Sequence, residues 1–218
     1  MGNAIVKSGK LYEVQRRVNE AQDSDIANIL YTSGTTGQSK GVILLHSQYR
    51  FALEAHTKVF TITPEDVIIN FLPFSHVFEG AWAKLCLSCG AHLAINLRPL
   101  DIQRSMREVQ PTCMCAVPRF WEKVYQGVLD KMESGSALQR SLIKDALKVG
   151  GEVWEKYTSK GKQPPLGLRM KYAAYDKTLL RLLRKTLGLT RPNIFPVAGA
   201  TVSPEVERFV HAAGFDML

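Results

Sequence analysis

The sequence lacks any apolar run close to the roughly 18 residues that a membrane-spanning helix needs. Its first residues, MGNAIVKSGKLYEV, contain no apolar core of the kind found in secretory signals. Acidic residues are also few, since 20 Asp and Glu stand against 28 Lys and Arg and give a formal net charge of +8. We therefore expect a cytoplasmic protein that is neither exported nor inserted in a membrane, with an anionic partner.

Cysteine is scarce as well, and the four cysteines are the first candidates for a metal site. Cys86 and Cys89 form a C-x-x-C pair, and Cys113 and Cys115 form a C-x-C pair, a spacing that can hold zinc. Both pairs lie in apolar stretches, however, and alternation along a strand would place Cys113 and Cys115 on one buried face. We therefore predict buried thiols, no metal ligand and no disulfide.

The composition is that of a folded chain. Of the 218 residues, 45% are apolar and 22% are charged, which excludes a disordered protein and allows one sizeable core or two small ones. From residue 25 onward, short β-rich runs alternate with helical patterns, which predicts an α/β fold with a mostly parallel sheet and helices on both faces. The expected strands are IANILYT, DVIINFL, AHLAIN, TCMCAV and NIFPVAG, and the expected helices are HSQYRFALEAHTKVF, VFEGAWAKLCLS, LDIQRSMREV and SPEVERFVHAAG; FDML is a last apolar run.

The pattern changes in residues 118–189, which contain helical stretches and no good strand. We interpret them as a helical insertion within an α/β piece that runs over residues 25–218, and residues 1–24 as a polar lead-in segment. Ser203 is expected to cap the last helix, with Pro204 in its first turn.

The segment from Tyr31 to Gly41, YTSGTTGQSKG, carries the clearest functional signal. Its glycines let backbone N–H groups turn toward one point, its hydroxyls can donate to phosphate oxygens, and Lys40 adds a positive charge. We expect a strand before this loop and a helix after it, the usual setting of an anion site in an α/β sheet. It is not a Walker loop, because Gly37 and Lys40 are not adjacent. A plain flexible connector is the alternative.

This segment resembles the phosphate-binding signature of adenylate-forming (AMP-binding) enzymes. Two further segments fit the same family: LPFSHVFE at residues 72–79, and VAGATVSPE at residues 197–205, in which Ala198 stands where the family has glycine. LPFSHVFE, together with VPRFWEKVY at residues 117–125, is similar to the long-chain fatty acid–CoA ligases (acyl-CoA synthetases) in particular. The resemblance runs from about residue 25 to the last residue.

The resemblance implies an AMP-forming ligation in two steps. A fatty acid carboxylate attacks the α-phosphate of ATP to give an acyl-adenylate, and the thiol of CoA then displaces AMP; ATP, Mg²⁺ and CoA are the implied cofactors and co-substrates. Because an anion must approach a polyanion, the loop has to neutralise and position phosphates. The implied phosphate-binding residues are Thr32, Ser33, Gly34, Thr35, Thr36, Gly37 and Lys40.

The other two segments supply the remaining candidates. The resemblance places His76 beside the acyl pocket, where it would orient the carboxylate as the implied catalytic residue; a histidine hydrogen-bonded in the core is the alternative. Gly199, Ala200 and Thr201 would pack on the adenine, and the alternative for them is a plain strand-to-helix turn.

Several parts of the family pattern have no counterpart in these residues: the Y-G-x-T-E motif, the aspartate that holds the ribose, and the small C-terminal domain. We therefore expect a fragment of the large N-terminal domain that does not form acyl-CoA by itself. Two other functions stay open. One is adenylation of a short-chain, aryl or amino acid, and the other is a non-catalytic nucleotide- or anion-binding module.

Basic residues gather in residues 161–192, where eight of them accompany one acid, Asp176. Helical periodicity places Lys177, Arg181, Arg184 and Lys185 on one face, opposite a row of leucines. Two interpretations stay open: a solvated helix face, which we favour, and contact of residues 176–188 with anionic lipid or with the phosphates of CoA. Leucines line this helix instead of interleaved aromatics, so we expect no nucleic acid partner.

Overall fold

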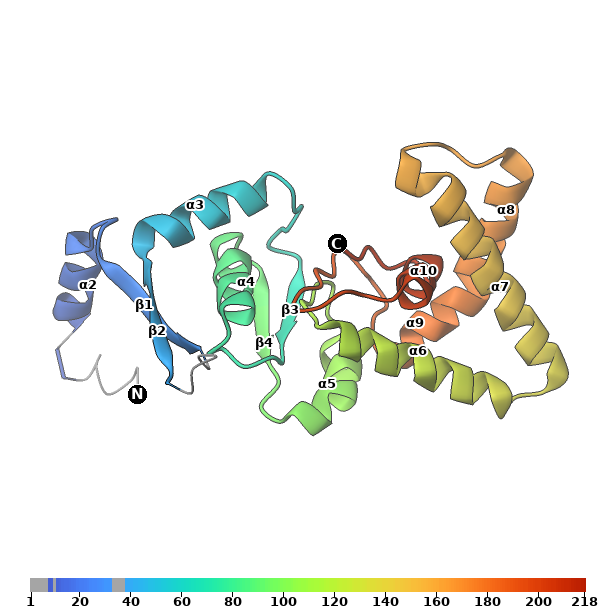
Figure 1. Ribbon diagram of the computed structural model, residues 1–218, viewed down its shortest axis with the longest axis horizontal. Coiled ribbons are helices and arrows are strands. Elements are labelled where there is room, and N and C mark those ends of the chain that lie inside the picture. The colour runs from blue at the N-terminus through green and yellow to red at the C-terminus, as the bar shows by residue number, and fades with distance from the viewer. Residues whose placement is uncertain (1–7, 10, 33–37) are drawn as a thin grey trace. The chain divides into compact units, whose positions relative to one another are not determined.

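The computed structural model describes residues 8–9, 11–32 and 38–218 (Figure 1). The chain divides into two compact units, residues 1–59 and residues 60–218. Each unit has its own secondary structure and is described by itself.

The first unit is built around an antiparallel hairpin. Strands β1 (Ile26–Thr32) and β2 (Lys40–Leu45) pair from Ile26 opposite Leu45 to Thr32 opposite Lys40. The strand predicted before the glycine-rich loop is confirmed. The helix predicted after the loop, HSQYRFALEAHTKVF, is confirmed as α3 (His46–Thr57). Strand β2 was not predicted, because the aliphatic run Val42–Leu45 becomes a strand only through its pairing with β1. Helix α2 (Leu11–Glu20) lies within the lead-in segment.

The second unit contains a set of parallel strands. Strand β3 (Val67–Asn70) pairs with β4 (His92–Ile95) on one side. Parallel bridges continue the set on the other side, from Ile68 to Cys113, from Cys113 to Ile194 and from Phe195 to Met217. The α/β prediction is therefore confirmed, and outside the β1–β2 hairpin every pairing among the described residues is parallel. The described strands form two small sheets rather than one.

Helices account for most of the remaining chain in this unit. Residues 118–187 are helical apart from short connections, and Figure 1 shows these helices as a group beside the strands. The helices are α4 (Val77–Ser88), η1 (Pro99–Asp101), α5 (Ile102–Val109), α6 (Pro118–Glu133), α7 (Ala137–Lys156), η2 (Thr158–Lys160), α8 (Leu166–Tyr175), η3 (Asp176–Leu180), α9 (Arg181–Leu187) and α10 (Pro204–Ala212). The predicted cap of α10 is confirmed, because Ser203 Oγ accepts from the Val206 N–H at 3.4 Å.

The core of the second unit centres on Trp121, which is fully buried. Its ring meets Phe195 edge-on at 5.7 Å and Phe215 at 5.3 Å, so α6 packs against two of the parallel strands. Aromatic pairs of this geometry add to the area that they bury. The VPRFWEKVY segment therefore contributes to the hydrophobic core through Trp121.

The predicted basic face is wrong at one position, Arg184. Its side chain is buried, donates to Asp176 Oδ1 at 2.7 Å and to the Ala213 carbonyl at 2.8 Å, and links α9 to the end of α10. Arg184 stands four residues after the buried Leu180 and three before the half-buried Leu187, a spacing that places it on the inward side of the helix. Lys177, Arg181 and Lys185 remain exposed, and we call these three residues the basic face.

Candidate functional site

The carboxyl ends of the parallel strands form the edge where an α/β fold binds its ligands. Three helices begin at this edge, each after a strand: α4 with N-cap His76, α6 with N-cap Val117, and α10 with N-cap Ser203. Helix N-termini carry unpaired N–H groups and partial positive charge. The edge therefore suits a phosphate or a carboxylate.

His76 stands at this edge, exposed to solvent, as the N-cap of α4. Its Nδ1 accepts from the Phe78 N–H at 3.3 Å, and its backbone N–H donates to the Pro73 carbonyl at 2.9 Å. An Nδ1 that accepts carries no proton, so the neutral ring is protonated at Nε2. The ring thus presents an N–H donor away from its own helix.

Glu79 is the residue of this region that sequence reasoning missed. It follows His76 by three residues, in the first turn of α4, and is fully buried. Its Oε1 accepts from Asn70 Nδ2 at 2.7 Å and from the Phe71 N–H at 3.0 Å, and its Oε2 accepts from Cys115 Sγ at 2.7 Å. Burial raises the pKa of Glu79, and these hydrogen bonds oppose the rise. An acid at this position in LPFSHVFE was visible, but its buried partners were not.

Residues 199–201 follow the strand at Ile194–Val197 and lead to α10. The Ala198 N–H donates to the Ala116 carbonyl at 3.2 Å, which keeps this strand paired up to the edge. Gly199 then turns with φ of 100°, a backbone conformation that favours glycine. Gly199, Ala200 and Thr201 are exposed at the same edge as His76, so the two groups of predicted residues share one side of the strand set.

The glycine-rich loop lies in the first unit, between β1 and β2. Thr32 and Lys40 are opposite each other as the last pair of the hairpin, and both are exposed. The hairpin therefore holds the two ends of the loop together. The predicted phosphate-binding residues Ser33, Gly34, Thr35, Thr36 and Gly37 lie outside the described residues.

The cysteines lie mostly in the core. Cys86, Cys113 and Cys115 are buried, and all four cysteines are free thiols. Burial raises the pKa of the three buried thiols, that of Cys113 to about 11. Among the residues that the structure describes, no group of three or more His, Cys, Asp or Glu could hold a metal ion.

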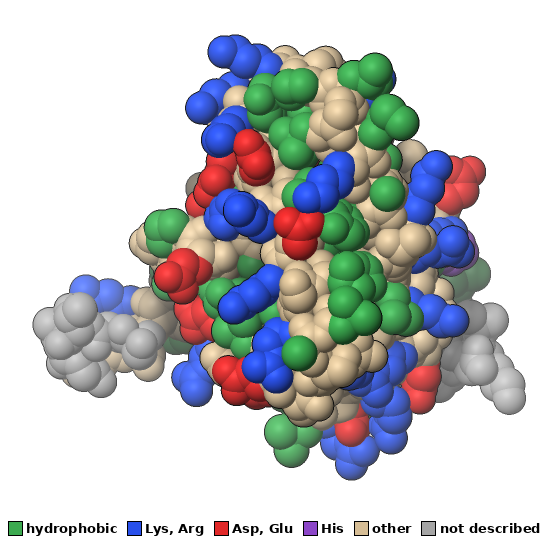
Figure 2. Space-filling view, turned by 90° about the vertical axis from the view of Figure 1, so that its right-hand side faces the viewer, with side chains coloured by type: hydrophobic (Ala, Val, Ile, Leu, Met, Phe, Trp, Pro, Cys, Tyr) green, Lys and Arg blue, Asp and Glu red, His purple; other side chains and the backbone are tan. Residues whose placement is uncertain are grey.

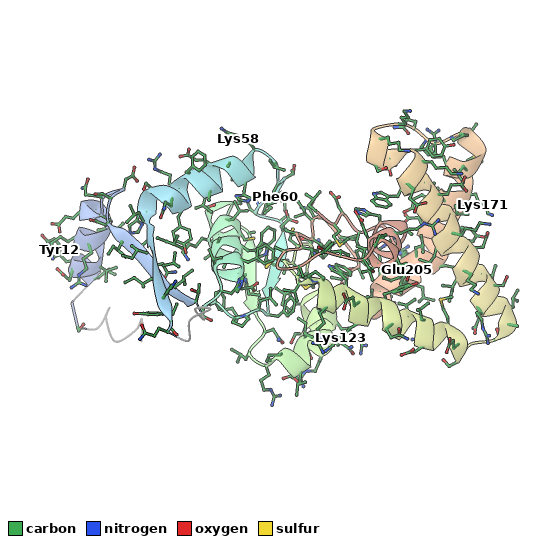
Figure 3. The ribbon with its side chains drawn as sticks, in the orientation of Figure 1. Tyr12, Lys58, Phe60, Lys123, Lys171 and Glu205 are labelled. Atoms are coloured by element: carbon green, nitrogen blue, oxygen red, sulfur yellow. The ribbon has the colours of Figure 1, made fainter. Side chains whose placement is uncertain are left out.

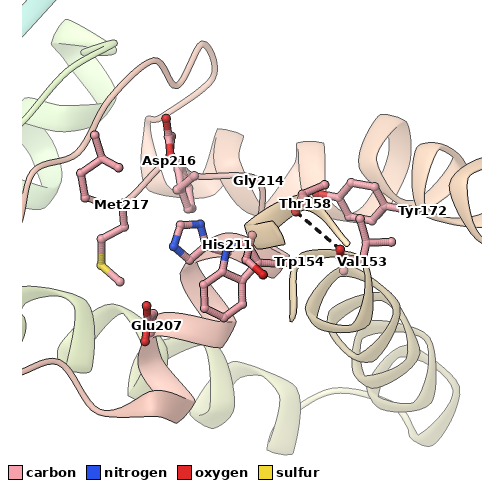
Figure 4. Close-up of a pocket in the computed structure, with 13 residues that line it drawn as sticks. Val153, Trp154, Thr158, Tyr172, Glu207, His211, Gly214, Asp216 and Met217 are labelled. Carbon is pink, nitrogen blue, oxygen red and sulfur yellow. Dashed lines mark hydrogen bonds between the residues drawn. The ribbon is translucent and has the colours of Figure 1, made fainter. Parts of the chain in front are cut away.

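A pocket of about 540 Å³ lies between α7, α10 and the last residues of the chain (Figure 4). Trp154 and His211 line it as a stacked pair, with ring centroids 4.3 Å apart and planes at 8°. Glu207 and Asp216 are its acidic lining residues. Among the described residues of this unit, His76, Gly199, Ala200 and Thr201 do not line this pocket.

Charged and apolar side chains are mixed on the surface of the helical region. Figure 2 looks onto the side of the structure where α7 and α8 lie, and shows Lys and Arg side chains interspersed with hydrophobic and acidic ones. Leu166, Met170 and Leu182 are each more than 60% exposed. Lys171 of α8 is tied to Asp145 of α7 at 2.8 Å (Figure 3). In the described part of the chain, no helix is long and apolar enough to cross a membrane.

Comparison with known proteins agrees with this architecture. A family model described as AMP-binding enzyme matches residues 3–217. The chain is 30% identical over 186 residues to "Long chain acyl-CoA synthetase 3" of Arabidopsis thaliana, an alignment that covers 83% of this chain and 26% of that relative. The chain thus spans about a quarter of the length of the curated relatives that it matches.

Solved structures show the same fold. The A-PCP didomain of carboxylic acid reductase from Segniliparus rugosus, in complex with AMP, matches with a TM-score of 0.59 and 21% identity over 91% of this chain and 24% of that chain. The N-terminal domain of FACL13 from Mycobacterium tuberculosis, with a bound inhibitor, matches with a TM-score of 0.55 and 18% identity over 91% of this chain and 37% of that chain.

Proposed function

The chain belongs to the AMP-binding enzyme family, and on that basis we propose that it is part of an AMP-forming long-chain fatty acid–CoA ligase. In this proposal the protein activates a fatty acid with ATP to an acyl-adenylate and then transfers the acyl group to CoA. The long-chain preference rests on the similarity to Long chain acyl-CoA synthetase 3 and on the LPFSHVFE segment.

The observation that carries the proposal is the carboxyl edge of the parallel strands. It gathers three helix N-termini, the exposed His76 and the turn at Gly199. Both substrates of the first step are anions, and fixed N–H dipoles stabilise an anion without reorganising during the reaction. The hairpin that holds Thr32 opposite Lys40 supplies the ends of a loop whose hydroxyls and lysine suit the outer phosphates of ATP.

Within this function each residue has a distinct task. His76 donates from Nε2 to an oxygen of the substrate carboxylate and so aims the other oxygen at the α-phosphate. Gly199, Ala200 and Thr201 pack on the adenine, and Thr32, Ser33, Gly34, Thr35, Thr36, Gly37 and Lys40 hold the β- and γ-phosphates. Magnesium would neutralise phosphate charge when bound; among the described residues, no group of three or more His, Cys, Asp or Glu could hold it by itself.

The basic face, Lys177, Arg181 and Lys185, gives this protein a second partner in the proposal. Exposed cations beside the exposed Leu182 suit a peripheral contact with an anionic lipid surface, where a fatty acid substrate partitions.

The test of the proposed function is a substitution at His76. In the full-length protein that carries these residues, His76→Ala should lower kcat/KM for adenylation of palmitate by about a hundredfold. A loss of this size is expected when the group that orients a substrate carboxylate is removed. Pyrophosphate release measures the rate, and thioester formation with CoA measures the second step.

The matched control is His92→Ala, since His92 begins β4 at the opposite, amino edge of the strands. It should leave the adenylation rate within twofold. Unchanged kinetics in His76→Ala would remove His76 from the reaction, and preferential use of a short-chain or aryl acid by the unaltered protein would replace the long-chain assignment.

A further inference from the structure

Glu79 is an ionisable residue in a place where the fold does not require one. It is completely buried under the end of strand β3, and α4 already has its N-cap in His76. Taking a carboxylate out of water is costly unless its oxygens are fully hydrogen-bonded. Here they are, because Asn70, Phe71 and Cys115 all donate to it, and the Leu72 backbone adds a further hydrogen bond.

These partners belong to three different elements. Asn70 ends β3, Phe71 begins the loop that leads to His76, and Cys115 lies on the adjacent strand. The carboxylate therefore joins helix α4, the carboxyl end of β3 and the neighbouring strand at one point. The loop of residues 71–75 is held by Glu79 at its start and by the N-cap of α4 at its end.

We propose that Glu79 is a positioning residue, which fixes the start of the 71–75 loop and thereby the placement of His76 at the carboxyl edge. This inference rests on the proposed function, in which His76 orients the substrate carboxylate. Glu79 itself is buried and touches no substrate. Its role is to preorganise His76, which contacts the substrate carboxylate.

A second buried acid in the same strands offers a matched control. Asp66 precedes β3 at the amino edge, where it accepts from Thr112 Oγ1 at 2.5 Å, from Asn193 Nδ2 at 3.1 Å and from the Thr63 N–H at 2.8 Å. Glu79 and Asp66 thus brace opposite ends of β3 by similar hydrogen bonds. If Glu79 were only a brace, loss of either acid would have the same consequences.

The experiment compares Glu79→Gln, which keeps the side-chain volume, with Asp66→Asn in the full-length protein. Glu79→Gln should speed hydrogen exchange of the Phe71 and Leu72 amides and raise KM for palmitate by about tenfold, while KM for ATP stays within twofold. Asp66→Asn should lower the melting temperature without changing either KM. Should Glu79→Gln fail to fold, Glu79→Asp keeps the carboxyl group but shortens its reach, and the same changes in exchange and KM are expected.

The outcomes separate this inference from the proposed function. If Glu79→Gln lowers the melting temperature as Asp66→Asn does and leaves KM for palmitate unchanged, Glu79 is a structural brace and the inference fails. Slow exchange of Phe71 and Leu72 in Glu79→Gln would also overturn it. If His76→Ala is fully active, the proposed function of His76 fails, whatever the exchange data show for the loop.

Discussion

His211 is a single residue whose ionisation is coupled to folding. Its ring is stacked on Trp154 in the pocket between α7 and α10 (Figure 4), and burial lowers the pKa of His211 below its usual 6.5, although Asp216 and Glu207 act in the opposite direction. The unfolded chain therefore takes up a proton at this position at a higher pH than the folded chain does.

The folded protein becomes less stable as the pH falls below 6.5. The contribution of His211 to stability is complete above pH 6.5 and is lost as the pH falls from 6.5 toward the lowered pKa of the folded state. We expect His211→Phe, which keeps a ring on Trp154, to show a smaller loss of unfolding free energy between pH 7 and pH 5.5 than the unaltered chain. Urea denaturation at each pH measures this. If the unfolding free energy fell equally with pH in the two proteins, the protonation of His211 would not be coupled to folding.

Individual residues differ in how far the sequence could predict them. His76 and Gly199 stand in motifs, and their exposure at strand ends follows from the α/β pattern. Glu79 stands in the same motif, but its role depends on Cys115, which lies 36 residues further along and approaches it only through the parallel pairing of two strands. A local motif contains no information about such a partner.

Among the elements, the helical segment from α8 to α9 shows a limit of periodicity. A regular helix places Lys177 and Arg184 on one face, because seven residues make nearly two turns. Arg184 also stands four residues after the buried Leu180, which places it on the inward side of the helix, where it donates to Asp176. Strand β2 was missed for a related reason. The aliphatic run at Val42–Leu45 shows no alternation of apolar and polar residues, so only its pairing with β1 identifies it as a strand.

The corrected basic face leads to a sharper test of lipid contact. We expect the double variant Arg181→Glu, Lys185→Glu to lose binding to vesicles of mixed phosphatidylserine and phosphatidylcholine by about tenfold or more, because each cation near an anionic surface is worth about 1 kcal/mol. Vesicle co-sedimentation at two salt concentrations measures it, and binding should fall as salt rises.

The control for this test makes the same charge change elsewhere. Lys123 and Lys131 are exposed on α6, and Lys123→Glu, Lys131→Glu should leave vesicle binding within twofold. Arg184 is left intact in both variants, since it is buried and paired. Equal losses in both double variants would indicate attraction through net charge alone, and no binding by the unaltered protein would leave the basic face as a solvated surface.

Across the chain as a whole, burial is uneven between the two units. In the described part of residues 1–59, Tyr49 is the single buried hydrophobic residue, whereas residues 60–218 hold the aromatic core around Trp121. The hydrophobic effect that stabilises the fold therefore acts mainly in the second unit. Composition predicted room for one core or two, but the division at residue 59 depends on contacts between distant strands and helices, which no local pattern reports.

The second unit also depends on a close approach between α7 and α10 that could not be predicted from the sequence. Gly150, in the middle of α7, faces the end of α10 so closely that a Cβ there would lie 2.5 Å from the Ala212 carbonyl oxygen and 2.9 Å from its Cα. Backbone atoms cannot move aside as a flexible side chain can. Gly150→Ala should therefore separate the two helices and destabilise residues 60–218 by about 2 kcal/mol.

Gly127 in α6 is the matched comparison, because a Cβ added there meets no atom within 4 Å. Gly127→Ala should stabilise the protein by about 0.5 to 1 kcal/mol, since alanine loses less backbone entropy in a helix. Hydrogen exchange read by mass spectrometry assigns each change to its unit: protection should fall across residues 60–218 in Gly150→Ala and stay constant in the β1–β2 hairpin. If both alanine variants were stabilising, α7 and α10 would not pack in contact at Gly150, and the Trp154–His211 stack that lies along the same pair of helices would lose its support.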